Sequence, residues 1–238
     1  MPLTRGLEGK IEFLPPSLLA EKLRDGKLDA ALVSVTEVLF HPGYVILDGI
    51  AVASCGKVQS VFLAHRQPLE AIETIWCDTA SLTSVNLLSI LLAERGLHPT
   101  FVPLPNYTSA HHYDAVLLIG NPAIDFLYSN PVHTLWDLGT AWFELTHLPF
   151  VFAVWALRQE IDHSLLRKQL KAARDSGLAA LDQIIQERDE YDIEFRKAYL
   201  GHHIHYSMGN FEKRGLLEFV NLLRKHNSEK IYDPIFVA

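Results

Sequence analysis

The sequence predicts an α/β protein of two lobes, and three observations support this fold class. Segments with strand and helix patterns alternate along the first half of the chain, an order that is typical of sheets containing parallel strands. The alternation occurs in two blocks that meet near residues 65–69. The chain also has 238 residues, enough for one large domain or two smaller lobes. We therefore expect two lobes with a cleft between them, a common place for a ligand site.

The first block begins with a predicted strand at residues 10–14. A helix is predicted at residues 17–25, because its leucines fall on one helical face and Gly26 follows as a stop signal. The apolar residues 28–33 then read as a buried strand. Two further extended segments are predicted at residues 44–47 and 58–64.

The second block repeats the order of strand, helix and strand. A strand is predicted at residues 72–77, and a helix follows in which Val85, Leu88 and Leu91 recur at helical spacing before Gly96 ends it. Two more strands are predicted at residues 98–103 and 115–119.

The remaining segments predict how the chain is divided between the lobes. Residues 135–146 have a helical pattern, and residues 148–157 are too apolar for a surface connection. Helical segments follow at residues 162–200 and 211–226. We expect the second block to return the chain to the first. Lobe I would then contain residues 1–67 and 150–238, and lobe II residues 68–149.

The composition argues against several classes of protein. A formal net charge of −7, with no local cluster of Lys and Arg, argues against a nucleic-acid partner. The longest apolar stretch, residues 148–157, is far shorter than the roughly 20 residues that span a bilayer, and the first ten residues lack the apolar segment of a signal peptide. Cys55 and Cys77 are distant in sequence and fit a reducing compartment. We expect a soluble, cytoplasmic protein with no membrane partner.

Residues 78–84, Asp-Thr-Ala-Ser-Leu-Thr-Ser, are the most informative segment. They follow the predicted strand 72–77 and place the hydroxyls of Ser81, Thr83 and Ser84 at the start of a helix. Free N–H groups and the positive end of the helix dipole attract anions there, so one hypothesis is a neutral cradle for a carboxylate or phosphate. The other is an ordinary N-cap at Ser81, with the next two hydroxyls in exposed first-turn positions.

The sequence has no recognisable metal, cofactor or nucleophile motif. His202, His203 and His205 are close together, and His111 and His112 form a pair, but no Cys or carboxylate completes a ligand spacing. The serines lack a Gly-x-Ser-x-Gly turn and an evident base partner. We expect neither a metal nor a cofactor, and an anionic ligand would have to be held by local dipoles.

Several segments together resemble one family, and the resemblance covers essentially the whole chain. The most specific pieces are residues 78–84 and the run Leu-Pro-Phe-Val-Phe-Ala-Val-Trp at residues 148–155. Further matching segments lie at residues 28–34, 50–54, 58–61 and 117–120, with a weaker match at 205–208 and 215–216. In these segments the chain resembles the cytoplasmic chorismate dehydratases of the futalosine route to menaquinone.

This resemblance implies a two-lobed α/β fold like that of type II periplasmic binding proteins, with two crossovers between the lobes. It also implies removal of water from chorismate to give 3-[(1-carboxyvinyl)oxy]benzoate, with no metal or cofactor. A proton leaves C3 and hydroxide leaves C4, and aromatisation drives the reaction. In the family's mechanism the enolpyruvyl carboxylate of the substrate can take the proton, so the protein's task would be positioning and electrostatic stabilisation.

The resemblance further implies which residues bind the substrate. Thr83 and Ser84 match family positions that hold a substrate carboxylate, and Ser81 lies in the same segment. Ser34, at the end of its predicted strand, and Ser60, near the first crossover, match positions that line the cleft.

Glu37 and Asn121 are the candidate catalytic residues that this sequence contains. Glu37 could orient the leaving hydroxyl or act as a general acid, and the alternative is a surface or capping carboxylate. Asn121 follows an Ile-Gly pair, where the family usually has an acidic residue, and keeps the hydrogen-bonding shape without the charge. A sister enzyme of the pathway, the dihydroxynaphthoate synthase, carries a His base in this stretch, so the Asn favours the dehydratase branch.

One departure from the family concerns the start of the chain. The family normally has a first strand ending in Tyr-x-Asn before a Pro-Leu pair, and that Asn is its best candidate catalytic residue. Here Pro2 and Leu3 follow Met1 directly, which we interpret as a start codon assigned too late. We expect the chain as written to leave neighbouring strands without a partner inside the sheet, to express poorly and to be inactive.

A second class of function is a non-catalytic cytosolic binding protein for an aromatic or dicarboxylic acid. The anion cradle of residues 78–84 does not depend on the missing Asn, and the sequence alone does not separate binding from turnover. The apolar run at residues 148–155 and the amphipathic segment 162–200 also leave room for a homodimer.

Overall fold

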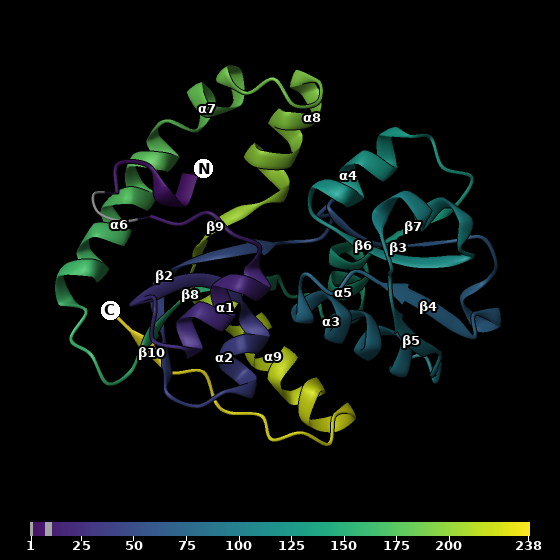
Figure 1. The fold of residues 1–238 in the computed structure, drawn as a ribbon, viewed down its shortest axis with the longest axis horizontal. Coiled ribbons are helices and arrows are strands. Elements are labelled where there is room, and N and C mark those ends of the chain that lie inside the picture. The colour runs from purple at the N-terminus through teal and green to yellow at the C-terminus, as the bar shows by residue number, and fades with distance from the viewer. Residues whose placement is uncertain (1, 8–10) are drawn as a thin grey trace.

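The computed structural model describes residues 2–7 and 11–238, which form two mixed β-sheets with helices packed around them (Figure 1). Sheet A has the strand order β1-β8-β2-β10, with β9 also paired to β2, and sheet B has the order β5-β4-β6-β3-β7. The α/β class is therefore as expected.

Sheet A is built around the apolar run predicted at residues 148–157. Its strands are β1 (Ala30–Ser34), β2 (Tyr44–Ser54), β8 (Phe150–Arg158), β9 (His205–Met208) and β10 (Phe236–Val237). β8 lies between β1 and β2 and is antiparallel to both. Most of its side chains are buried in this position. The run at residues 148–155 is therefore apolar because it is buried within one chain, and its composition does not require a dimer.

Sheet B comes from one continuous part of the chain. Its strands are β3 (Val61–His65), β4 (Thr74–Cys77), β5 (Thr100–Pro103), β6 (Ala115–Ile119) and β7 (Thr134–Asp137). β4 is parallel to β5 and β6, whereas β3 is antiparallel to β6 and β7. The carboxyl ends of β4 and β6 therefore meet the beginning of β3 at one edge.

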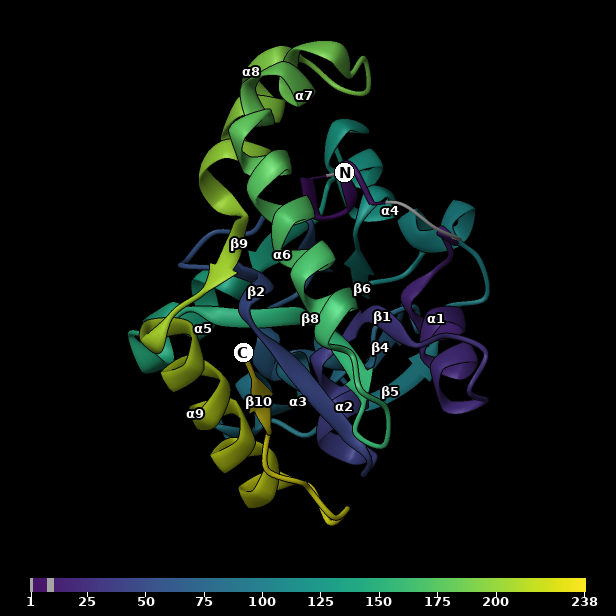
Figure 2. The same ribbon diagram turned by 90° about the vertical axis from the view of Figure 1, so that its left-hand side faces the viewer.

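Along the chain, the helices lie before, between and after the strands. The α-helices are α1 (Pro16–Arg24), α2 (Val35–Phe40), α3 (Leu82–Ala93), α4 (Asn121–Tyr128), α5 (Leu138–Thr146), α6 (Ser164–Ala179), α7 (Leu181–Glu187), α8 (Ile193–Ala198) and α9 (Asn210–His226). Short 3-10 helices lie at Pro2–Thr4, Leu69–Ala71 and Tyr107–His112. Figures 1 and 2 show α6, α7 and α8 as a curved row that leads from sheet A towards α4.

Three sequence-based predictions of secondary structure differ from the structure. Residues 11–15 have no regular secondary structure, so the strand predicted at 10–14 is wrong there, and Lys10 lies outside the described residues. The predicted helix at 135–146 is divided into β7 and α5, because the Asp137 side chain accepts a hydrogen bond from the Thr140 N–H and caps a new helix. The tail at 162–200 is broken into α6, α7 and α8, followed by a π-helical turn at Tyr199–His203.

The first crossover lies earlier than the boundary that we expected between residues 67 and 68. β3 is hydrogen-bonded to β6 and β7, so it belongs to sheet B, and the chain leaves sheet A between Ser54 and Val61. The carboxylate of Asp137 fixes this connection by accepting hydrogen bonds from the backbone N–H groups of Val58 and Gln59. The chain returns to sheet A at the start of β8.

Among the described residues β1 is an edge strand of sheet A, with β8 as its neighbour on one side and no paired strand on the other. That the chain as written leaves a neighbouring strand without a partner stays a prediction. β1 pairs directly with β8 over five residues, from Ala30 opposite Leu157 to Ser34 opposite Ala153. The two strands therefore satisfy each other's backbone groups along this side, without an unpaired strand between them.

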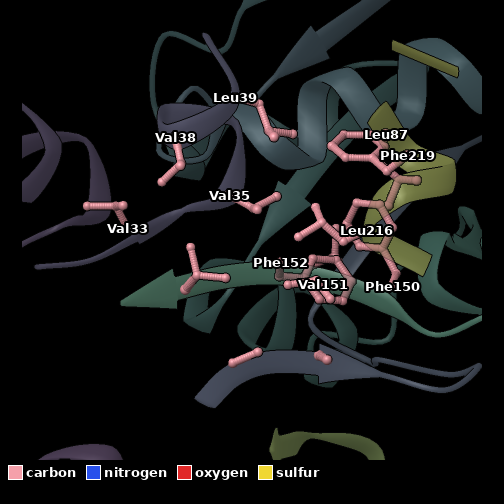
Figure 3. Packing of buried hydrophobic residues seen from close by; sticks show 14 of the residues in the cluster. Val33, Val35, Val38, Leu39, Leu87, Phe150, Val151, Phe152, Leu216 and Phe219 are labelled. Carbon is pink, nitrogen blue, oxygen red and sulfur yellow. The ribbon is translucent and has the colours of Figure 1, made fainter. Parts of the chain in front are cut away.

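The larger hydrophobic core connects the two sheets (Figure 3). Phe150 of β8 packs edge to face against Phe219 of α9, with their ring centroids 4.9 Å apart. Leu87 of α3 lies beside these rings, and Val35 and Leu39 of α2 approach from the other side (Figure 3). Helix α3, which follows a strand of sheet B, is thereby packed against elements of sheet A.

Substitution of Gly215 tests the contact between α9 and the start of β8. A Cβ atom at Gly215 would lie 1.9 Å from the carbonyl oxygen of Pro149, which is backbone and cannot swing aside. We expect Gly215→Ala to lower the free energy of unfolding by about 1–3 kcal/mol, the usual cost of overpacking. Chemical denaturation measures this loss.

Gly201→Ala is the matched control, because its new Cβ would make only an ordinary 3.7 Å contact with Ile185 Cδ1. Equal stabilities for the two variants would contradict the packing of α9 described above.

Candidate ligand-binding site

Three connected loops form the edge of sheet B that faces sheet A. The Asp78 N–H donates to the Leu117 carbonyl oxygen at 3.0 Å, and the Gly120 N–H donates to the Ser60 carbonyl oxygen at 2.7 Å. The ends of β4 and β6 and the beginning of β3 therefore lie side by side. Helices α3 and α4 both start here, and neither has an acidic residue in its first turn. The positive ends of two helix dipoles thus meet at this edge.

Hydroxyl groups join this edge to sheet A. The hydroxyl oxygens of Ser34 and Ser81 are 3.0 Å apart. Thr83 Oγ1 accepts a hydrogen bond from the Thr36 N–H at 3.1 Å and lies 3.1 Å from Thr36 Oγ1. The Ser84 hydroxyl donates to Ser81 Oγ at 3.4 Å. We call these five residues, Ser34, Thr36, Ser81, Thr83 and Ser84, the hydroxyl cluster.

The geometry bears on the two hypotheses for residues 78–84. Ser81 is the N-cap residue of α3, as the capping hypothesis states, but its side chain makes no capping hydrogen bond and contacts Ser34 instead. Thr83 and Ser84 are not exposed first-turn residues, since their exposed fractions are 0% and 1%. The hydroxyls are therefore directed at one another and at sheet A.

Two neighbouring cavities share the wall formed by Ser17, Thr79 and Ala80, and of the two only the first is lined by residues of the hydroxyl cluster, Ser34 and Thr36. The first has a volume of about 80 Å³ and lies between α1, the β1–α2 junction and the loop before α3. The second has a volume of about 320 Å³ and is lined by polar groups of Asp78, Asn106 and Tyr107. Ligand sites in proteins start at roughly 300 Å³, so the second cavity alone reaches that size.

Glu37 is neither a surface nor a capping carboxylate. It lines the first cavity, is 4% exposed, and both of its oxygens accept hydrogen bonds from Arg24 Nη1 at 2.7 and 2.6 Å. His41 Nε2 lies 3.8 Å from Glu37 Oε2. The negative charge of Glu37 is thus balanced by the arginine, which keeps the surroundings of the hydroxyl cluster close to neutral.

Ser60 and Asn121 lie on the same edge of sheet B but line neither of the two cavities. Ser60 precedes β3, is buried, and its Oγ accepts a hydrogen bond from the Tyr199 hydroxyl at 3.0 Å. Asn121 is the first residue of α4 and is exposed. The structure therefore joins Ser34, Ser81 and Ser84 by hydrogen bonds and joins Thr83 to Thr36 instead. Among the described residues, no hydrogen bond links Ser60 or Asn121 to either group.

Asp78 is the carboxylate nearest to the start of α3. Its Oδ1 accepts hydrogen bonds from the Ala80 N–H at 2.8 Å and the Tyr107 hydroxyl at 3.2 Å. Its Oδ2 is buried and has no hydrogen-bond partner among the described residues. Burial raises the pKa of Asp78, although the hydrogen bonds from Ala80 and Tyr107 oppose the shift. The Asp78 carboxyl is therefore harder to ionise than an exposed aspartate.

Sequence reasoning missed four residues of this region. Thr36 and Arg24 contact predicted site residues, and Tyr107 and Tyr199 hold Asp78 and Ser60. Only Thr36 could have been found from the sequence, because it lies two residues after the predicted site residue Ser34. The other three are brought in by tertiary contacts that no spacing in the sequence reveals.

The described residues contain no group of three or more His, Cys, Asp or Glu side chains placed to hold a metal ion. Within the same residues, no helix is both long enough and apolar enough to cross a membrane.

The pH dependence of stability tests the environment of Asp78. Because burial raises its folded pKa above the ordinary value of 3.8, the folded protein binds more protons than the unfolded chain between the two pKa values. The stability that Asp78 contributes therefore falls as the pH rises through this window. Asn cannot ionise, so Asp78→Asn should gain stability relative to the parent as the pH is raised from acidic to neutral.

Urea unfolding over a pH series measures this gain. Asp29→Asn, at an exposed aspartate, is the control and should show no such trend. A stability difference between the Asp78 variant and the parent that is independent of pH would contradict the assignment.

Comparison with solved structures identifies the fold. Protein AF1704 from Archaeoglobus fulgidus superimposes with a TM-score of 0.67 and 18% sequence identity, covering 88% of this chain and 83% of that chain. The periplasmic aliphatic sulphonate binding protein SsuA from Escherichia coli superimposes with a TM-score of 0.57 and 16% identity, covering 94% and 81%. The chain thus has the two-lobed fold of periplasmic binding proteins.

Sequence comparison identifies the family. The chain is 35% identical over 199 residues to a chorismate dehydratase from Thermus thermophilus, covering 76% of this chain and 73% of the relative. It is 27% identical over 230 residues to a chorismate dehydratase from Campylobacter jejuni, covering 95% and 90%. A family model described as menaquinone biosynthesis matches residues 1–225. This protein therefore belongs to the menaquinone biosynthesis family.

Proposed function

We propose that this protein is a chorismate dehydratase, a carbon–oxygen lyase that eliminates water from chorismate to give 3-[(1-carboxyvinyl)oxy]benzoate. The observation that carries the proposal is the hydroxyl cluster, which joins the start of α3 to sheet A in a chain that is similar to chorismate dehydratases. We further propose that the protein acts in the cytoplasm, in the futalosine route to menaquinone, as the family resemblance implies.

The charge of the site suits a dianion such as chorismate. The amino ends of α3 and α4 contribute the positive ends of their dipoles at the same edge. The hydroxyls of the cluster can donate hydrogen bonds without adding charge. The buried Glu37 carboxylate is balanced by Arg24, so it adds little repulsion. Together these features support carboxylate binding by dipoles.

In the described structure the hydroxyls of the cluster bond to one another. A bound carboxylate would replace these neutral contacts with charge-assisted hydrogen bonds, which are shorter and roughly twice as strong. The exchange would let the ligand hold sheet A and sheet B together through the same residues that now join them. Thr83 and Ser84 would contact the carboxylate, and Ser34 would close over it from β1.

The elimination requires the protein mainly to orient the substrate. The proton at C3 and the hydroxide at C4 leave as one water molecule, and the ring becomes aromatic. With the enolpyruvyl carboxylate of the substrate as the base, the protein has to fix the conformation that brings this carboxylate to C3. Hydroxyls and helix N-termini that bind the ring carboxylate of the substrate can hold it in this conformation.

Incubation of the purified protein with chorismate tests the proposal. Conversion is followed by mass spectrometry as the loss of one water and by ultraviolet absorbance as the appearance of an aromatic ring. We expect the rate to be unchanged after dialysis against EDTA. Because we expect the chain as written to be inactive, the same assay is run on a chain extended upstream to restore the family's first strand and its Asn. Tight binding of chorismate without conversion by either chain would support a non-catalytic binding protein, and the absence of both binding and conversion would reject the assignment.

Substitution of Ser84 tests the proposed contact with a carboxylate. Loss of a hydrogen bond to a charged group costs about 1.5–3 kcal/mol, so Ser84→Ala should weaken binding of the product 3-[(1-carboxyvinyl)oxy]benzoate by roughly tenfold or more. The effect on folding should be small, because Ser84 makes only a long 3.4 Å hydrogen bond within the chain. Calorimetric titration measures the affinity.

Ser89→Ala is the matched control, because it makes the same change at an exposed position of α3. If both variants bind the product as tightly as the parent, Ser84 is not part of the site.

A further inference from the structure

Tyr199 approaches the candidate site from a distant part of the chain. It is the first residue of the π-helical turn Tyr199–His203 that follows α8. Its hydroxyl donates to Ser60 Oγ at 3.0 Å, across 139 residues of sequence. Ser60 is in turn held by its backbone, since its carbonyl oxygen accepts from the Gly120 N–H just before α4. Tyr199 thus reaches the edge where β3 begins and α4 starts.

The direction of this hydrogen bond decides what Ser60 can do. Burial raises the pKa of the Tyr199 phenol above its ordinary value of 10.0, so the phenol is protonated at neutral pH and can donate. A serine hydroxyl has one proton and two lone pairs. When Ser60 Oγ accepts from Tyr199, its own proton is left for a different acceptor.

The ring of Tyr199 is held independently of its hydroxyl. It stacks on Phe195 of α8, with ring centroids 5.5 Å apart and an angle of 19°. Phe195 also packs against Tyr128 of α4 and against Tyr191. The Tyr191 hydroxyl donates to Asp125 Oδ1 at 2.8 Å, and the Tyr128 hydroxyl donates to Asp192 Oδ2. This aromatic bridge between α8 and α4 keeps the ring in place when the Tyr199 hydroxyl is removed.

We propose that Tyr199 is a positioning residue that turns the Ser60 hydroxyl proton towards a carboxylate of the ligand at the edge of sheet B. The inference rests on the proposed function, because it takes the ligand to be an organic dianion such as chorismate. One carboxylate would meet the hydroxyl cluster and the other would meet Ser60, near the start of α4. Tyr199 itself would touch Ser60 and not the ligand.

A double-mutant cycle tests whether Tyr199 acts through Ser60. Tyr199→Phe and Ser60→Ala should each raise KM for chorismate by about three- to tenfold, the effect of one hydrogen bond, with a smaller change in kcat. In the Ser60→Ala background, Tyr199→Phe should have no further effect. Effects of the two substitutions that simply multiply would overturn the inference, because they would mean that Tyr199 acts independently of Ser60.

Tyr191→Phe is the matched control, since it removes one hydroxyl from the same aromatic bridge but not the one that reaches Ser60. Its KM should stay at the parental value. Melting temperatures of all variants report whether folding is preserved.

A crystal structure of ligand-free Tyr199→Phe gives a second readout that needs no substrate. The Ser60 side chain should rotate or occupy several rotamers in this variant and keep one rotamer in Tyr191→Phe. An unchanged Ser60 in Tyr199→Phe would reject the positioning role. If neither the parent nor the chain extended upstream with the family's first strand converts chorismate, the proposed function fails, and the crystal structure still decides whether Tyr199 orients Ser60.

Discussion

Thr83 is fully buried, and its hydroxyl oxygen accepts a hydrogen bond from the backbone N–H of Thr36. This bond joins the first turn of α3 to the first turn of α2, and so joins sheet B to sheet A. A buried N–H without a partner is costly, which means that the Thr36 N–H keeps the two turns together as long as Thr83 is present. Next to this contact Ser34 of sheet A meets Ser81 of the loop before α3, and α3 itself packs against elements of sheet A through the apolar core.

The region around that contact is polar, and its charges are balanced or limited. Arg24 neutralises Glu37, and the carboxylate of Asp137 is occupied by three backbone N–H groups at the first crossover and at the start of α5. Burial opposes ionisation of Asp78. The helix dipoles and hydroxyls are then the main features that an anion would meet. Such an arrangement can bind a dianion without a lysine or arginine dedicated to it.

The local parts of this architecture could be predicted from the sequence. β6 was predicted at its observed residues, and α1, α3 and α9 were placed within a few residues, because periodic leucines and glycine stop signals are local. The hydroxyls of α3 were found for the same reason. β9 and β10 were not predicted, since such short strands exist only through their pairing with β2. Arg24 and Tyr199 escaped notice because their roles depend on contacts that only the folded chain creates.

Sheet B is formed by one continuous part of the chain, whereas sheet A is formed by segments that are far apart in sequence. This difference affects folding during synthesis on the ribosome. All strands of sheet B lie between Val61 and Asp137, so this sheet has every strand available before β8 has been made. In sheet A, β1 must wait for β8, and β2 pairs last with Phe236 near the carboxyl end. Contacts of such long sequence separation form slowly. During translation β1 and β2 therefore remain without their central partner while sheet B can fold, which makes these two strands the segments that most need protection from premature pairing with other chains.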